Sequence, residues 1–340
     1  MSVTVFDPQQ EMLRRMQKSA FHGRIRPGED PLSWQCDARC KLERLLGLPF
    51  EAVDPQVEVS WTREKEGYRE TRFLFRSEEE VRVPCHLLLP KTDKDKLPLM
   101  VCLQGHSTGM HISLGQAKFP KDAEDIAGDR DFALQAVKRG YAALTIEQRG
   151  FGECGGTEKG PDCHQIAVQA LLLGRTLIGE RCWDIRCALE VVAELFPAID
   201  QNRVALMGNS GGGTTTLYAT ALDPRISAAM PSCAFSGFLP SIGAQRHCIC
   251  NYIPGIMEEF DMTELAGLIA PRPLVIVSGR YDGIFPLESA KEQFEIAREN
   301  YYAPLGVRDR IRHVIGAQGH RFYAEDSWPV FELLTGWNEN

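Results

Sequence analysis

A serine in a glycine-rich turn is the residue of this chain best suited to covalent chemistry. Ser210 stands in the run GNSGG, which matches the G-x-S-x-G pattern of a nucleophile elbow. The apolar run 204–207 before it predicts a buried strand, and residues 214–222 after it predict a helix. Glycines two positions either side of the serine avoid clashes in so tight a turn. We therefore interpret Ser210 as a nucleophile at the carboxyl edge of a sheet.

The same pattern occurs a second time, around Ser107 in the run GHSTG. Glycine is common enough that a chain of this length can match the pattern by chance, so the surrounding structure has to decide between the two. The residues that follow Ser107 give no clean start of a helix. We expect Ser210, and not Ser107, to be the nucleophile.

A serine hydroxyl needs a general base, and the base needs an acid that orients it. In α/β-hydrolases the three residues follow in the order serine, acid, histidine. Asp282 comes shortly after the predicted strand 274–277, and His320 comes shortly after the predicted strand 312–315. Because the carboxyl ends of parallel strands meet at one edge of a sheet, the sequence predicts a triad of Ser210, Asp282 and His320.

Three other titratable residues are weaker candidates for these roles. Asp261 and Glu264 lie in the segment between two predicted strands, where either is an alternative to Asp282 as the acid. His313 lies inside a predicted strand, so we expect it to be a core residue and not the base.

An oxyanion hole needs two hydrogen-bond donors. The backbone N–H of Gly211 is the first candidate, because it stands at the N-terminus of the predicted helix. The second should come from the loop after the first central strand, where we select the backbone N–H of His106. We expect polar and aromatic side chains near these loops to line the substrate pocket: Gln104, His111, His247, Tyr252 and Phe285.

These residues require a sheet that brings the ends of several strands together. Residues 57–61, 68–75 and 81–89 alternate in polarity and predict an antiparallel edge. Further along, strands and helices alternate, which is typical of parallel α/β units. The predicted parallel strands are 99–103, 142–146, 204–207, 226–231, 274–277 and 312–315, and the clearest helices between them are 131–139 and 183–195. The fold class is therefore α/β, with a doubly wound, mostly parallel sheet.

The chain divides into a small extension and one large domain. Residues 1–55 predict a helical N-terminal extension, with helices at 8–21 and 34–46. Residues 56–340 predict the α/β-hydrolase catalytic domain, with a small cap insertion at about 235–268. We expect the extension either to pack on its own domain or to contact a second subunit of a homo-oligomer.

Composition excludes several classes of partner. The 340 residues carry a net charge of −8, which argues against nucleic acid as a partner because phosphate binding needs clustered positive charge. No run of about 18 apolar residues predicts a membrane span, and the first residues lack the pattern of a secretory signal. We expect a cytoplasmic enzyme that binds a small ester.

Eleven cysteines occur in the chain, and we expect them to be reduced thiols. The pairs Cys36 with Cys40 and Cys248 with Cys250, the latter directly after His247, lack zinc-finger spacing. From spacing alone we expect no metal site, and we expect these cysteines to be packed residues or to line the pocket.

A family resemblance adds to this interpretation. The runs that carry it are QGH ending at His106, EQRGFG from Glu147, GRTLIGER, GNSGGG, GRYD ending at Asp282 and GH ending at His320. They resemble α/β-hydrolases of the acetyl xylan esterase and cephalosporin-C deacetylase type, near the dienelactone-hydrolase-like proteins. The resemblance covers roughly residues 85–335. It implies a serine–aspartate–histidine triad, hydrolysis of carboxylic esters and no cofactor. Many relatives carry His-Gly where this chain has Gln104-Gly105.

The function expected from these observations is a serine esterase that removes short acyl groups, acetyl above all, from small molecules or sugars. A peptidase of the prolyl-oligopeptidase kind is an alternative, although the stretch before residue 99 is too short for the propeller such enzymes add. A hydrolase-fold binding protein is another alternative. Such proteins typically lose a member of the triad, whereas all three residues are present here.

Overall fold

The computed structural model describes residues 7–337, and within them nine strands form one sheet. The order across the sheet is β1-β2-β3-β5-β4-β6-β7-β8-β9. In this order the three neighbouring pairs from β1 to β5 are antiparallel, and the five pairs from β5 to β9 are parallel. The strands are β1 (Glu58–Glu64), β2 (Tyr68–Glu78), β3 (Val81–Pro90), β4 (Leu97–Leu103), β5 (Ala142–Ile146), β6 (Ile199–Asn209), β7 (Ala228–Ser232), β8 (Leu274–Gly279) and β9 (Ile311–Gly316).

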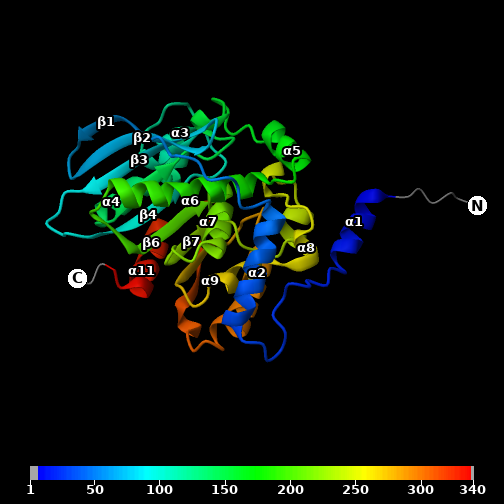
Figure 1. Cartoon of the computed structure of the whole chain (residues 1–340). Coiled ribbons are helices and arrows are strands. Elements are labelled where there is room, and N and C mark those ends of the chain that lie inside the picture. The colour runs from blue at the N-terminus through cyan, green and yellow to red at the C-terminus, as the bar shows by residue number, and fades with distance from the viewer. Residues whose placement is uncertain (1–6, 338–340) are drawn as a thin grey trace, which may run out of the picture.

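Helices cover both faces of this sheet (Figure 1). The larger apolar core lies on the face covered by α2 (Pro31–Leu46), α6 (Leu177–Leu195), α7 (Gly211–Leu222), α9 (Met262–Ile269) and α10 (Leu287–Ala297). The second core lies on the opposite face, under α4 (Phe132–Lys138) and α11 (Ala324–Thr335). The remaining α-helices are α1 (Pro8–Met16), α3 (Asp122–Asp125), α5 (His164–Leu172) and α8 (Ile256–Glu259). This confirms the predicted doubly wound sheet with an antiparallel N-terminal edge.

The burial of the central strands explains why their apolar runs are clear in the sequence. Every residue of β4, β5, β7 and β8 is buried, as expected for parallel strands covered on both faces. The register between β6 and β7 pairs Asn209 with Ser232, and the register between β4 and β6 pairs Leu103 with Gly208. The carboxyl ends of these strands therefore meet at one edge of the sheet.

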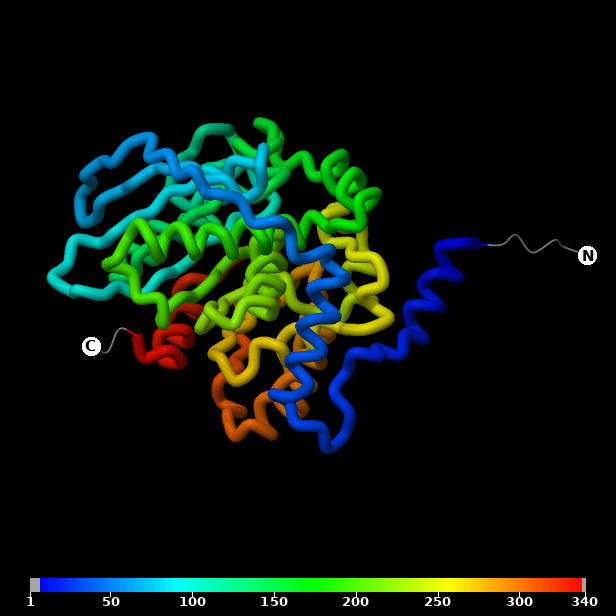
Figure 2. The backbone as a smooth tube through the Cα atoms, in the orientation of Figure 1, coloured from blue at the N-terminus to red at the C-terminus, as the bar shows by residue number. Residues whose placement is uncertain are grey.

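The two helices of the N-terminal extension behave differently. Helix α1 projects from the body and contacts it at the turn Leu239–Gly243, whereas α2 lies along it (Figure 2). In α2, Trp34, Leu42 and Leu46 belong to the larger core, and the side-chain amide of Gln35 donates to the carbonyls of Gly267 and Ala270 at distances of 2.8 and 2.5 Å. Helix α2 therefore packs within its own chain, which is one of the two placements expected for the extension.

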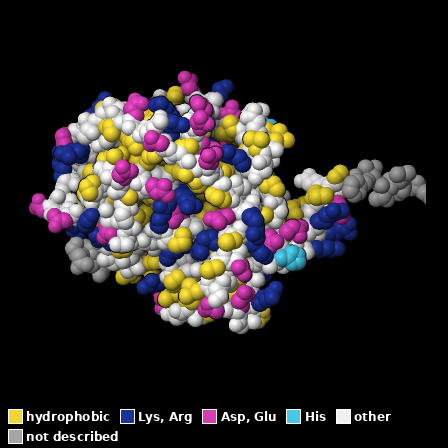
Figure 3. Space-filling view, in the orientation of Figure 1, with side chains coloured by type: hydrophobic (Ala, Val, Ile, Leu, Met, Phe, Trp, Pro, Cys, Tyr) yellow, Lys and Arg dark blue, Asp and Glu magenta, His cyan; other side chains and the backbone are white. Residues whose placement is uncertain are grey.

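The cap insertion forms short helical pieces. After β7 the chain makes single turns at Leu239–Gly243, at Ile249–Asn251 and in α8, and then enters α9. The eight residues of α9 are all buried, so the end of the insertion is part of the core. Acidic and basic side chains are mixed over the face seen in Figure 3. Among the described residues, no helix has the length and apolar character needed to cross a membrane.

Candidate active site

Ser210 occupies a sharp turn between β6 and α7. Its φ of 54° and ψ of −122° lie outside the regions that L-residues prefer, which is the strain expected of a nucleophile elbow. Glycine is required on both sides of it. A Cβ at Gly208 would stand 2.5 Å from the carbonyl carbon of Gly212, and a Cβ at Gly212 would stand 2.2 Å from the carbonyl oxygen of Leu103. The glycine pattern is therefore a steric requirement of this turn.

The second match to the motif has no such geometry. Ser107 lies in a loop before a short 3-10 turn, Met110–Leu114, and no α-helix follows it directly. Its hydroxyl is buried without a hydrogen-bond partner among the described residues. The structure therefore gives Ser107 neither the turn nor the base that a nucleophile needs.

Asp282 and His320 form a hydrogen-bonded pair at the carboxyl edge of the sheet. Nδ1 of His320 lies 2.8 Å from Oδ2 of Asp282, which follows β8, while His320 follows β9. The other oxygen of Asp282 accepts from the backbone N–H groups of Ile284 and Phe285 at 2.8 and 3.1 Å. Burial alone would raise the pKa of Asp282, but the bonds from His320 and from these N–H groups lower it below its ordinary value. The ionised carboxylate thus holds the proton of His320 on Nδ1 and leaves Nε2 as the base.

The loop that carries His320 is tied to the elbow through one residue of β7. The backbone N–H of Ser210 donates to the carbonyl oxygen of Ser232 at 2.8 Å. The hydroxyl of Ser232 in turn donates to the carbonyl oxygen of Arg321 at 3.4 Å. Phe285 stacks on the His320 ring with a centroid separation of 6.2 Å and an interplanar angle of 15°. These contacts fix both the backbone and the ring plane of the base.

The loop after β4 lies directly against the elbow. A Cβ at Gly105 would stand 3.0 Å from Cβ of Ser210, and a Cβ at Gly211 would stand 2.7 Å from Cε1 of His106. Gly211 is the first residue of α7, where backbone N–H groups have no partner within the helix. The backbone N–H of His106 has no hydrogen-bond partner within residues 7–337. Both predicted oxyanion donors therefore stand beside Ser210 with their hydrogens unused.

Arg130 is a residue of this site that the sequence did not reveal. Its Nη1 pairs with Asp125 at 2.6 Å and its Nε donates to the side-chain oxygen of Gln104 at 3.3 Å. Its Nη2 is buried and has no partner among the described residues. A Cβ on Gly105 would stand 3.3 Å from this Nη2, as well as close to Ser210. A buried cationic N–H group is thus left free next to the nucleophile.

Of the predicted pocket residues, the structure brings two to the site. Phe285 stacks on His320, and the His247 ring meets Phe285 edge-on at 5.1 Å between centroids. Nε2 of His247 is buried and has no partner within the described part of the chain. Burial lowers the pKa of His247, so this ring is held neutral with an unpaired nitrogen beside the triad.

The side chains of the other three predicted pocket residues have other contacts. The amide of Gln104 is buried and donates to the hydroxyl of Ser113 and the carbonyl of Arg130, so Gln104 positions Arg130. Nε2 of His111 lies 2.8 Å from Oδ2 of Asp122, and His111 lines a separate pocket beside β1 and β2. Tyr252 lines a groove of about 570 Å³ next to α1, away from the triad. Local sequence showed that these residues lie in neighbouring loops but not which way they point.

The weaker candidates from the sequence take structural roles. Asp261 caps α9, and Glu264 pairs with Arg24 at 2.8 Å, so neither lies with His320. His313 is bonded to the hydroxyl of Ser278 at 2.9 Å, and burial lowers its pKa to about 4. None of the three contacts His320, whereas Asp282 does.

A buried ion-pair network braces the loop that follows β5. Arg149 pairs with Glu78, Glu180 and Asp184 at 2.8, 3.2 and 2.7 Å. Burial would lower the pKa of Arg149, but these carboxylates raise it above its ordinary value. The network joins β2 and α6 to the loop that follows β5, and so it holds that loop in place.

Two proteins of known sequence are similar to this chain along most of their length. "Putative hydrolase YtaP" of Bacillus subtilis (strain 168) is 27% identical over 289 residues, which are 84% of this chain and 94% of that protein. "Carbohydrate esterase MZ0003", from an unknown prokaryotic organism, is 23% identical over 310 residues, which are 81% of this chain and 68% of that protein.

Solved structures show the same fold. A crystal structure described as a "putative acetyl xylan esterase" from Bacteroides fragilis NCTC 9343 superposes with a TM-score of 0.76 at 19% identity, covering 96% of this chain and 84% of the other. A glucuronoyl esterase from Solibacter usitatus superposes with a TM-score of 0.71 at 16% identity, covering 92% and 95%. The Abhydrolase family itself matches residues 3–303. With its elbow, its doubly wound sheet and this match along most of its length, the chain is a hydrolase that belongs to the Abhydrolase family.

Proposed function

We propose that this hydrolase is a serine esterase that releases short acyl groups, acetyl above all, from a carbohydrate or a similar small molecule. The observation that carries the proposal is the grouping of a strained serine, a histidine oriented by a buried carboxylate and two free backbone donors at one sheet edge. That set of groups is suited to acyl transfer through a covalent intermediate. The names of two solved structures and of one relative, all esterases of carbohydrates, support the substrate class.

Each group has a defined part in the proposed reaction. Nε2 of His320 accepts the hydroxyl proton of Ser210 as Oγ attacks the ester carbonyl carbon. The carbonyl oxygen becomes an oxyanion, which the N–H groups of Gly211 and His106 and the free Nη2 of Arg130 stabilise. The intermediate collapses, the alcohol leaves with the proton from His320, and the acyl group stays on Ser210.

Water completes the cycle by the same groups. His320 takes a proton from water as the water oxygen attacks the acyl carbon, and a second oxyanion forms at the same donors. Collapse releases the carboxylic acid, and Ser210 Oγ regains its proton from His320. Asp282 stabilises the imidazolium that forms twice in each turnover. No group other than these residues, the ester and water is needed for the atoms and charges to balance.

The short acyl preference rests on the form of the cap insertion. Its pieces before α9 are single helical turns, and it lacks the long amphipathic helix that a lipase lid uses at an interface. An open tunnel would gain about 0.8 kcal/mol for each added methylene, or roughly fourfold in kcat/KM. We expect kcat/KM to be highest on acetyl to butyryl p-nitrophenyl esters and to fall by octanoyl.

The test is a substrate panel below micelle-forming concentrations, with acetylated sugars, methyl esters of uronic acids and a peptide amide beside the aryl esters. The proposal predicts the highest kcat/KM for acetylated sugars. If kcat/KM rises steadily beyond octanoyl, the protein is a lipid esterase and not a deacetylase. Preference for the methyl esters of uronic acids would mean that the sugar supplies the acyl part of the ester and not the alcohol. Cleavage of the amide alone would indicate a peptidase.

A further inference from the structure

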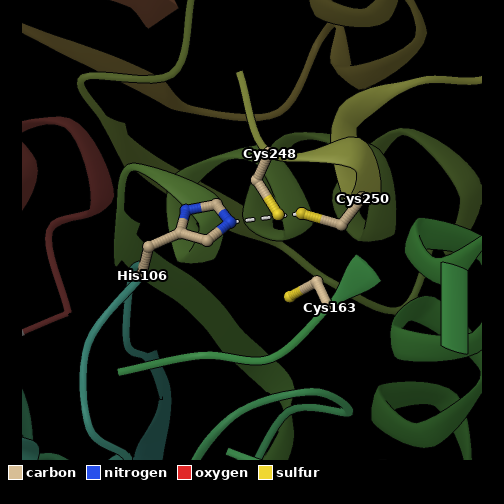
Figure 4. A group of neighbouring side chains, drawn as sticks. All are labelled: His106, Cys163, Cys248 and Cys250. Carbon is tan, nitrogen blue, oxygen red and sulfur yellow. Dashed lines mark hydrogen bonds between the residues drawn. The ribbon is translucent and has the colours of Figure 1, made fainter. Parts of the chain in front are cut away.

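One side chain of the oxyanion loop belongs to a second cluster of ligating groups. His106 follows β4, Cys163 immediately precedes α5, and Cys248 and Cys250 lie in the cap insertion. Nε2 of the histidine and the three Sγ atoms all lie within 4.8 Å of one another, and Nε2 is 3.2 Å from Sγ of Cys250. Figure 4 shows the four side chains pointing into one space from three separate segments.

The donor set and its dimensions fit one divalent zinc ion. Three cysteines and one histidine are a common set of ligands in closed structural zinc sites, which are tetrahedral. Bond lengths of such sites place the ligand atoms about 3.5 to 3.8 Å apart. Small inward shifts of side chains already within 4.8 Å would therefore complete a tetrahedron. An apolar shell that includes Phe151, Ala167 and Leu177 surrounds the group.

A buried arginine supplies an independent sign that this cluster carries negative charge. Nη2 of Arg181 lies 3.3 Å from Sγ of Cys163, and the guanidinium stacks on the Phe151 ring at 4.4 Å. Arg181 is almost completely buried, yet no carboxylate of residues 7–337 pairs with it. A buried cation without a counter-charge is costly. Zinc with three thiolates and a neutral imidazole carries one net negative charge, which would compensate that of Arg181.

We propose that Nε2 of His106 and the thiolates of Cys163, Cys248 and Cys250 bind one structural zinc ion. Binding releases three thiol protons to solvent and leaves the remaining imidazole proton on Nδ1. All four positions are filled by protein, so the ion has no open position for catalysis. The expectation of no metal, which rested on sequence spacing, is replaced by this proposal because the ligands come from three distant segments.

The position of the cluster gives the ion a role in the active site. His106 holds one of the two proposed oxyanion donors on its backbone, and its ring lies against Gly211, which holds the other. A metal bound to the ring would fix the loop after β4 in the geometry that the oxyanion requires. The same ion would join the cap insertion, through Cys248 and Cys250, to the catalytic loop.

Metal content of the full chain tests the proposal directly. Protein purified under reducing conditions without chelator should contain one zinc ion per chain, as measured by elemental mass spectrometry. Replacement of the zinc by Co²⁺ should give the intense visible bands and the thiolate charge-transfer absorption of a tetrahedral site. Cys163→Ser and Cys250→Ser should each lower the zinc content severalfold, whereas Cys36→Ser, an exposed position on α2, should leave it unchanged.

The wild-type chain provides a second measurement in case a variant does not fold. Stripping with a chelator should lower Tm, and adding Zn²⁺ back should restore it, because a ligand that binds only the folded state stabilises it. Zinc absent from protein grown with ample zinc, together with no cobalt spectrum, would overturn the proposal. Iron at the site, a disulfide among these cysteines after alkylation, or equal zinc in Cys163→Ser and Cys36→Ser would overturn it as well. Ser210→Ala should keep its zinc, so the result does not depend on the proposed esterase activity.

Discussion

At the scale of single residues, the site combines groups that a sequence pattern reveals with groups that it hides. The sequence predicts Ser210, Asp282 and His320 because each follows a predicted strand. Arg130 was not predictable, since it lies in an irregular loop and reaches Ser210 only through the fold. The zinc ligands were hidden for the same reason: Cys163 stands more than eighty positions from Cys248, and only packing places them together.

Arg130 gives the sharpest prediction at this scale. If its free Nη2 stabilises the oxyanion, Arg130→Gln should lower kcat by about 10²- to 10³-fold, the loss typical of one such donor, with a smaller change in KM. Arg130→Lys keeps the charge and should lose less. Steady-state kinetics on an acetyl ester and a thermal melt of each variant measure this. An unchanged kcat in folded Arg130→Gln would make Arg130 a positioning residue for Gln104 alone.

The buried carboxyl group of Glu147 should make the free energy of unfolding depend on pH. This carboxyl follows β5 and accepts from the backbone N–H of Met110, and burial raises its pKa to about 7. The unfolded chain loses the proton near its ordinary value of 4.5, so the folded state loses stability as the pH rises from there to about 7. The loss amounts to about 3 kcal/mol.

Glu147→Gln removes that ionisation while retaining an acceptor. The Tm of the variant relative to wild type should therefore increase between pH 4.5 and pH 8. Paired thermal melts at several pH values measure the difference. A Tm difference that does not change with pH would mean that Glu147 titrates normally in the folded protein.

At the scale of elements, α2 shows that a capping side chain can determine where a helix begins when hydrophobic periodicity does not. The apolar spacing predicted a helix from residue 34, whereas the helix begins at Pro31 because the Asp30 side chain caps it by accepting from the N–H of Ser33. Its end at Leu46, before Gly47 in the left-handed region, agrees with the prediction. Patterns thus place the middle of this element, and side-chain capping places its start.

The packing of α2 predicts that the extension contributes to stability. Leu42 is completely buried in the larger core, so Leu42→Ala should lower the free energy of unfolding by about 2 to 5 kcal/mol. Leu32, on the same helix, is 50% exposed, and Leu32→Ala should change it by less than about 0.5 kcal/mol. Thermal or denaturant unfolding of both variants measures the contrast. Equal, small effects would mean that α2 does not pack against α6, α7 and α9.

At the scale of the whole molecule, every proposed part of the reaction depends on one sheet edge. Helix α7, the cap insertion and the loops after β4, β8 and β9 reach this edge from distant parts of the sequence. Hydrophobic patterning predicted strands along the chain, their antiparallel N-terminal edge and a doubly wound sheet. It did not predict side-chain directions in the loops, which is why His111 and Tyr252 were expected in the pocket and lie elsewhere.

The central claim is that Ser210 forms the acyl-enzyme, and an active-site fluorophosphonate followed by peptide mapping tests it most directly. The account predicts one labelled serine, Ser210, in wild type, the same label in Ser107→Ala, and no label with kcat reduced by several orders of magnitude in Ser210→Ala. Labelling of Ser107, or full ester hydrolysis by Ser210→Ala, would contradict it.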